Sequence, residues 1–149
     1  MGGARRAFDR AMQLEQENIN TYDIYSAITT HIGLKRLLSS LITEAKGHLQ
    51  ELEELDRRFD EESMFDPTKA ESIGALEYAD VEYAFDGSME YIDFLRMIFT
   101  REQALATLYD GLSGASADED AVHLFKRLAE DCRKHVWLAK DRYDLETLK

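Results

Sequence analysis

Apolar residues recur every three or four positions along four long stretches of the chain, which is the period of an amphipathic α-helix. In the second stretch His48 stands on the same stripe as Leu41 and Leu52, so the pattern predicts that the imidazole faces the core. In the third stretch Glu102 shares its stripe with Tyr109 in the same way. Four helices with polar residues on their buried faces are therefore expected. They span about residues 5–30, 34–59, 88–112 and 119–145.

The connections between these helices predict their arrangement. Gly33 is expected to end the first helix, and Ser88 and Asp118 are expected to cap the third and the fourth. Residues 60–87 are acidic, contain the only proline and have room for one or two short helices, so they form a long crossover. Short loops join antiparallel helices within each pair. The fold class is therefore all-α, an antiparallel four-helix bundle with one crossover, in a single domain of residues 1–149.

The chain also repeats itself at a constant offset of 87 residues. The segments EQENINTY and EQALATLY, which begin at Glu15 and Glu102, each place a carboxylate two helical turns before a tyrosine. The same offset relates the two inward-facing histidines. Two hairpins related by an approximate twofold axis would bring these residues to the centre of the bundle. The matched pairs are Glu15 with Glu102, Tyr22 with Tyr109, and His48 with His135.

The matched glutamates and histidines are candidate metal ligands. A single core glutamate is usually paired with a basic residue, and a single core histidine is usually just hydrogen-bonded. Here, however, two carboxylates and two imidazoles share buried faces on which basic residues are scarce, and an uncompensated buried charge costs several kcal/mol. One divalent cation compensates all four groups. The matched tyrosines are expected to be core aromatics. The alternative, which is compatible with that role, is that they donate to a ligand carboxylate across the bundle.

Composition narrows the class of partners. The formal charge of −12 and the pI of about 4.7 exclude a basic surface for nucleic acid. No run of apolar residues approaches the roughly 18 that span a membrane, and the start of the chain lacks the apolar segment of a signal peptide, so a cytoplasmic protein is expected. Cys132 is the single cysteine, which excludes an intrachain disulfide and any CxxC metal module.

The Glu-x6-Tyr pattern on the first and third helices, together with LITEAKGH and LAEDCRKH on the second and fourth, resembles the rubrerythrin group of the ferritin-like superfamily. The resemblance covers about residues 7–145. It implies an antiparallel bundle that holds two iron ions, with a glutamate from each of two helices and a Glu-x-x-His motif from each of the other two. It also implies reduction of peroxide or dioxygen, or oxidation of ferrous iron, and homodimerisation.

Both Glu-x-x-His motifs lack their glutamate, because Ala45 and Cys132 stand three residues before the two histidines. Two carboxylates and two imidazoles remain, which suits one ion better than two. Glu44 and Asp131, four residues before each histidine, share its helical face and are possible additional ligands. Cys132 is either a thiolate ligand, which would favour zinc or a thiolate-bound iron, or a small buried apolar side chain.

Three hypotheses about function remain open. The first is a rubrerythrin-like, iron-dependent oxidoreductase, which would need an external electron donor because the chain has no rubredoxin-type CxxC pairs. The second is a non-redox protein with one bound zinc or iron ion, and the third is a metal-free helical scaffold. A homodimer is expected, with the aromatic residues of the crossover, Tyr78, Tyr83 and Phe85, against the partner.

Overall fold

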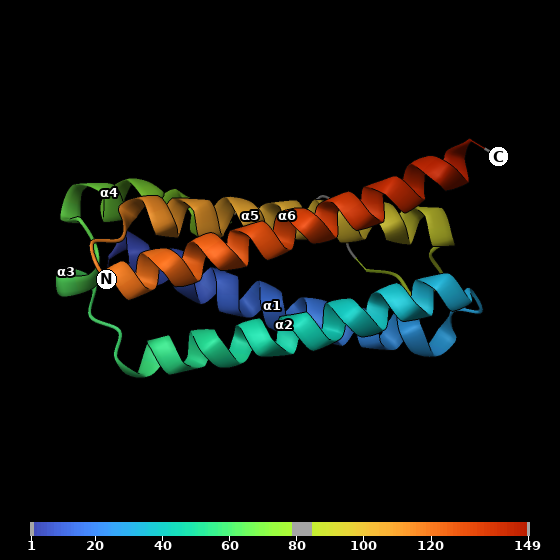
Figure 1. Cartoon of the computed structure of the whole chain (residues 1–149), viewed down its shortest axis with the longest axis horizontal. Helices are drawn as coiled ribbons and strands as arrows, with labels where there is room; N and C mark the ends of the chain where they lie inside the picture. The colour runs from blue at the N-terminus through green and yellow to red at the C-terminus, as the bar shows by residue number, and fades with distance from the viewer. Residues whose placement is uncertain (1, 79–84, 149) are drawn as a thin grey trace.

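The computed structural model describes residues 2–78 and 85–148 and confirms the all-α prediction. The helices α1 and α2 form one antiparallel hairpin, α5 and α6 form the other, and α1 also packs on α5 (Figure 1). The crossover between the hairpins returns the chain so that the two halves of the sequence lie side by side. The long helices are α1 (Gly3–Ile28), α2 (Ile32–Arg57), α5 (Tyr91–Ala115) and α6 (Glu119–Thr147).

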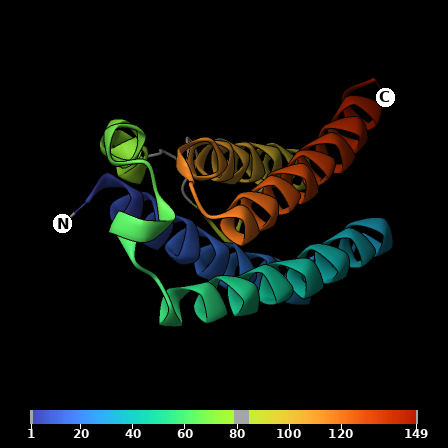
Figure 2. The same ribbon diagram turned by 60° about the vertical axis from the view of Figure 1, so that its left-hand side comes forward.

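The described part of the crossover consists of short helices gathered at one end of the bundle, beside the start of α1 (Figure 2). Asp66 caps one of them with its side chain, and Pro67 at the first helical position fits because that position needs no backbone donor. The backbone N–H of Asp66 donates to Ala115 O at 2.9 Å, which ties the crossover to the end of α5. The predicted helix beyond Tyr78 lies outside the described residues. The elements are α3 (Glu61–Met64), α4 (Pro67–Ser72) and η1 (Ile73–Tyr78).

Two predicted helix boundaries were wrong. Gly33 lies inside α2, because the chain leaves α1 through an extended Thr29, a conformation that requires no glycine. Ser88 does not cap α5: both its backbone N–H and its hydroxyl donate to Asp86 Oδ1 at 2.9 Å, in a turn that precedes the helix. The N-cap position belongs to Glu90, whose side chain makes no capping hydrogen bond. The ends of α1 and α5 are thus determined by the backbone at Thr29 and by the turn at Asp86, and not by the predicted glycine and serine.

The predicted cap at Asp118 is confirmed, since its Oδ2 accepts a hydrogen bond from the backbone N–H of Ala121 at 2.9 Å. Replacing this residue (Asp118→Ala) is expected to lower the free energy of unfolding by about 1 kcal/mol, because a backbone donor of α6 loses its partner. Chemical denaturation would measure the change. Asp120→Ala, in the same first turn, removes a charge but no cap and is the control. Equal losses in both variants would show that charge and not capping is responsible.

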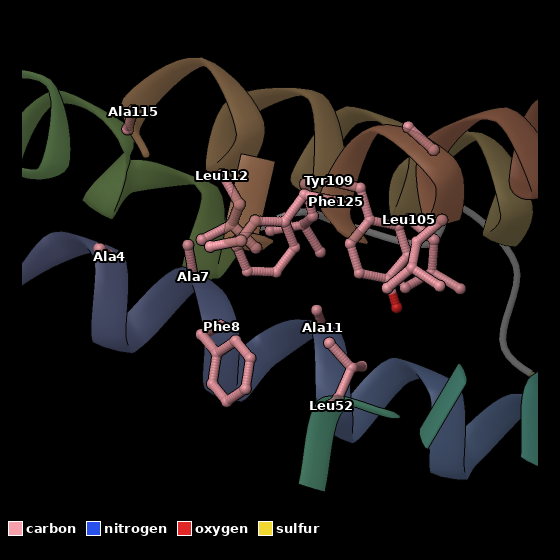
Figure 3. Packing of buried hydrophobic residues seen from close by; sticks show 14 of the residues in the cluster. Ala4, Ala7, Phe8, Ala11, Leu52, Leu105, Tyr109, Leu112, Ala115 and Phe125 are labelled. Atoms are coloured by element: carbon pink, nitrogen blue, oxygen red, sulfur yellow. The ribbon is translucent and has the colours of Figure 1, made fainter. Parts of the chain in front are cut away.

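The apolar core is divided into two clusters with polar residues between them. All four long helices contribute to both clusters. The crossover-end cluster includes Phe8, Leu52 and Phe125 (Figure 3), and the far-end cluster includes Leu38 and Phe94. Between the clusters each helix carries at least one buried polar side chain. We call this set the polar belt: Glu15 and Asn18 on α1, His48 on α2, Arg101 and Glu102 on α5, and His135 on α6.

The crossover aromatics bear on the expected homodimer. Phe85 packs against the far-end cluster, with its ring centroid 6.1 Å from that of Phe94, so it covers the core of its own chain. Tyr83 and the side chain of Tyr78 lie outside the described residues. Within those residues, every helix is too short or too polar to cross a bilayer.

Candidate metal centre

The four predicted ligands lie near the middle of the four long helices and are all buried, with 2–4% of each residue exposed. The structure brings them together as two pairs. Glu15 Oε2 lies 3.3 Å from His48 Nδ1, which joins α1 to α2. Glu102 Oε2 lies 3.5 Å from His135 Nδ1, which joins α5 to α6. The two imidazole rings face each other with centroids 6.3 Å apart, so the pairs belong to one site.

A second carboxylate contacts each histidine from the outer side, and it comes from the opposite hairpin. His48 Nε2 lies 2.9 Å from Asp131 Oδ2, and His135 Nε2 lies 2.7 Å from Glu44 Oε2. Metal-bound histidines commonly donate their second ring N–H to such a carboxylate, which fixes the ring and directs the other nitrogen inward. Glu44 and Asp131, which are partly exposed, therefore orient the imidazoles instead of pointing into the belt.

Tyr22 and Tyr109 are fully buried members of the two apolar clusters. The hydroxyl of Tyr22 donates to Glu102 Oε1 at 3.2 Å, so this tyrosine is a core aromatic that also contacts a candidate ligand. Tyr109 points its hydroxyl from α5 toward α1 (Figure 3), but its oxygen has no hydrogen-bond partner among the described residues. Burial raises the pKa of both phenols well above the ordinary value, and the charges of Glu102 and Glu15 raise it further.

Cys132 is fully buried and faces the site. One ligand atom from each of Cys132, Glu15 and His48 lies within 4.8 Å of the others. Burial raises the pKa of the thiol well above the ordinary value, and the charges of Glu102 and Glu15 add to the shift. The side chain is thus a protonated thiol when no cation is near, and a cation would have to displace its proton.

The ionisation of the other site residues follows from burial and from their pairing. Burial raises the pKa of Glu15 to about 7, although the hydrogen bond and charge of His48 oppose the shift. Burial lowers the pKa of His135, but the contacts with Glu102 and Glu44 outweigh it and the net pKa is about 9. His48 is raised in the same way by Glu15 and Asp131. Without a cation, the site thus holds protons that a metal would replace.

Sequence reasoning missed a polar pair in the belt. The guanidinium of Arg101, only 6% exposed, donates to Asn18 Oδ1 at 3.2 Å. Its positive charge lowers the pKa of Tyr22 and so partly offsets the effect of burial. The repeat itself carries the signal, because the positions equivalent to Arg101 and Asn18 are Leu14 and Leu105. Asn18 lies in one half of the repeat and Arg101 in the other, and each is matched by a leucine, so the halves differ at both positions.

Comparison with known proteins supports the fold but not a family. No known family profile matches the chain, and no curated protein matches it. A crystal structure of a two-domain protein from Anabaena variabilis, containing DJ-1/ThiJ/PfpI-like and ferritin-like domains, superposes on 96% of this chain with a TM-score of 0.65 and 19% sequence identity. This chain spans 39% of the length of that protein. The four-helix bundle with its central polar belt therefore has a ferritin-like fold.

Proposed function

We propose that this protein binds one divalent metal ion, iron or zinc, in the polar belt between Glu15, His48, Glu102 and His135. The observation that carries the proposal is the pairing of two buried carboxylates with two buried imidazoles whose outer nitrogens contact surface carboxylates. Two glutamates neutralise a divalent charge, and two neutral imidazoles complete a set of four donors. Because the ion neutralises both carboxylates, the free-energy cost of burying two negative charges is removed.

Two buried polar atoms of the belt also fit a cation. Glu15 Oε2 and His135 Nδ1 each lie close to an ion-pair partner, at 3.3 and 3.5 Å, but make no hydrogen bond of good geometry among the described residues. Buried polar atoms in native proteins nearly always have partners, so these two atoms indicate a missing ligand. A pair of ions would need bridging carboxylates, and Ala45 and Cys132 cannot supply them. The donor set therefore fits one ion.

The decisive measurement is the metal content of untagged protein, purified without added metal or chelator, by elemental mass spectrometry. One iron or zinc per chain is expected in the wild-type protein, and none in a His48→Ala/His135→Ala double variant. His123→Ala, which removes an exposed histidine from α6, is the control and should keep its metal. A wild-type protein that holds no metal, and whose thermal stability does not respond to iron or zinc, would leave the metal-free scaffold as the better hypothesis.

A second candidate function is a rubrerythrin-like oxidoreductase, which is favoured by the hydrogen bond from Tyr22 to Glu102 beside the candidate ligands. Iron would supply redox chemistry toward peroxide or dioxygen. In this function Glu102 is held in place by the tyrosine, the apolar clusters exclude water from both sides, and an external donor delivers electrons. Peroxide-dependent oxidation of a reductant by the iron-loaded protein would support it. Absence of turnover, with metal bound, would leave the non-redox function.

Removal of the outer carboxylates is expected to weaken metal binding without removing a candidate ligand. Asp131→Asn and Glu44→Gln each lose the charge that orients one imidazole, and an outer-sphere change of this kind lowers affinity about 10-fold to 100-fold. Competition with a chromophoric chelator would measure the dissociation constant. Glu130→Gln, an exposed neighbour on α6, should bind like the wild-type protein. Unchanged affinity in the Asp131 and Glu44 variants would contradict the proposed orientation of the histidines.

A further inference from the structure

At one matched position beside the candidate ligands, one half of the repeat has a metal donor, Cys132, and the other half has none, Ala45. The 87-residue offset matches Glu15 with Glu102, His48 with His135, and Ala45 with Cys132. We call Glu15, His48 and Cys132 the first half-site, and Glu102, His135 and Ala45 the second half-site. Each half-site has a carboxylate from one hairpin helix and an imidazole from its neighbour. Only the first half-site has a third donor, because Ala45 offers none.

The geometry of the first half-site is close to that of a metal site. Its three ligand atoms lie within 4.8 Å of one another, and each residue is buried. Bonds of about 2.0–2.3 Å to a tetrahedral ion place neighbouring ligand atoms about 3.5 Å apart. Small rotations of the side chains would therefore bring the oxygen, nitrogen and sulfur to bonding distance. The donors come from α1, α2 and α6, so an ion there would also join the two hairpins.

An independent observation points to a ligand at this place. Glu15 Oε2 lies 3.3 Å from His48 Nδ1, but it makes no hydrogen bond with good geometry, and it is buried. The buried hydroxyl of Tyr109, directed toward α1, is also without a hydrogen-bond partner among the described residues. The first half-site thus combines a buried thiol with an oxygen that lacks a partner. Tyr22, by contrast, satisfies Glu102 in the second half-site.

We propose that the bound ion lies in the first half-site and is held by Glu15, His48 and the thiolate of Cys132. This assignment rests on the proposed metal-binding function. It replaces the four donors given there with the three donors of the first half-site, so that Glu102 and His135 are not ligands of the ion. The thiol releases its proton when the ion binds, so one carboxylate and one thiolate neutralise the divalent charge. The second half-site then remains an ion pair, with Glu102 3.5 Å from His135 and hydrogen-bonded to Tyr22. One position on the ion stays open.

The donor set defines the class of metal. A thiolate, an imidazole and a carboxylate together favour a borderline ion such as Zn²⁺ or Fe²⁺ over Mg²⁺ or Ca²⁺, which prefer oxygen ligands. Because Cys132 is matched by Ala45 in the repeat, only one half-site contains sulfur, and the proposed site is mononuclear and asymmetric. A symmetric site built from the four matched glutamates and histidines would contain no sulfur, so spectroscopy distinguishes the two arrangements.

Cobalt substitution tests the assignment, since Co²⁺ bound to a thiolate shows charge-transfer absorption in the near ultraviolet. Chelator-treated wild-type protein titrated with Co²⁺ is expected to develop this band with one ion per chain. Cys132→Ser should still bind Co²⁺, at least about tenfold more weakly, and should show no band. Cobalt binding to the wild-type protein without the band would overturn the assignment and leave the proposed function standing. Failure of the wild-type protein to bind Co²⁺, Zn²⁺ or Fe²⁺ would overturn both.

A gain of sulfur in the other half provides a test that does not depend on losing a core residue. Ala45→Cys places a thiol at the matched position of the second half-site. The variant is expected to bind a second Co²⁺ and to double the charge-transfer absorption per chain. Ala129→Cys, a buried alanine of α6 outside the belt, is the control and should behave like the wild-type protein. An Ala45→Cys variant that folds but binds a single ion with unchanged absorption would contradict the half-site geometry.

Discussion

A Glu15→Gln variant is expected to be more stable than the wild-type protein in the absence of metal and to lose nearly all of the stabilisation that metal provides. Burial raises the pKa of Glu15 to about 7, so at pH 8 the folded protein must hold an ionised carboxylate in an apolar core. This shift is a net value that already includes the contact with His48, and it corresponds to about 3 kcal/mol. The neutral amide avoids the cost, and a gain of about 1–3 kcal/mol is expected.

The same substitution removes an anionic donor, so metal affinity is expected to fall by more than about 100-fold. Denaturation curves with chelator and with saturating zinc, each recorded at pH 8, measure both effects in one experiment. Asp23→Asn is the matched control, because it makes the same kind of change at an exposed position of α1. A variant that is less stable than the wild-type protein without metal would show that Glu15 has a structural role, and the metal argument would lose its main support.

The expected gain in metal-free stability and the expected loss of metal affinity in Glu15→Gln are together typical of a functional site. Evolution toward stability alone would replace a buried glutamate whose only ion-pair partner among the described residues is a histidine, whereas a metal ligand is kept at a cost to the metal-free fold. Arg101 is buried in the same belt but donates to Asn18 Oδ1, which is an uncharged oxygen. Among the described residues, both belt glutamates form ion pairs with histidines, and Glu102 also accepts a hydrogen bond from Tyr22.

The fold could be predicted because its strongest signals are local and repeated. Long apolar stripes define the four helices, and the length of the crossover defines how the hairpins connect. The wrong predictions, at Gly33 and Ser88, concern helix ends, where a single hydrogen bond such as that between Ser88 and Asp86 decides the outcome. A glycine near a helix end indicates the end of the helix only when the backbone there adopts a left-handed conformation. Among the described residues, none has a positive φ.

The candidate site could be predicted only as far as helical periodicity reaches. Periodicity and the repeat identified which residues face inward, and the structure places them together. They could not show that Asp131 contacts His48, or that Glu44 contacts His135, because these pairs join opposite hairpins and depend on how α2 and α6 cross. The position of Cys132 beside Glu15 depends on the same crossing.

The stability of the protein with and without metal is expected to diverge as the pH rises from 5 to 9. Without metal, Glu15, His48 and His135 all have raised pKa values in the folded state. A group with a raised pKa stabilises the fold fully below its unfolded pKa and loses that contribution as the pH passes its folded pKa. The losses fall between about pH 4.5 and 7 for Glu15, and between about pH 6.5 and 9 for His135. The metal-free protein should therefore become less stable across the range.

Metal binding has the opposite dependence, because the ion must displace the same protons. Each proton released adds about 1.4 kcal/mol of binding free energy per pH unit until its group is ionised. The stabilisation by zinc, measured as the difference in unfolding free energy with metal and with chelator, is thus expected to grow with pH while the stability of the metal-free protein falls. In a His48→Gln/His135→Gln variant, both the increase of zinc stabilisation with pH and the decrease of metal-free stability with pH should be smaller than in the wild-type protein. In His123→Gln both should be unchanged. If the two curves of the wild-type protein ran parallel from pH 5 to 9, the added ion would not be replacing protons on these buried groups, and the polar belt would not be the binding site.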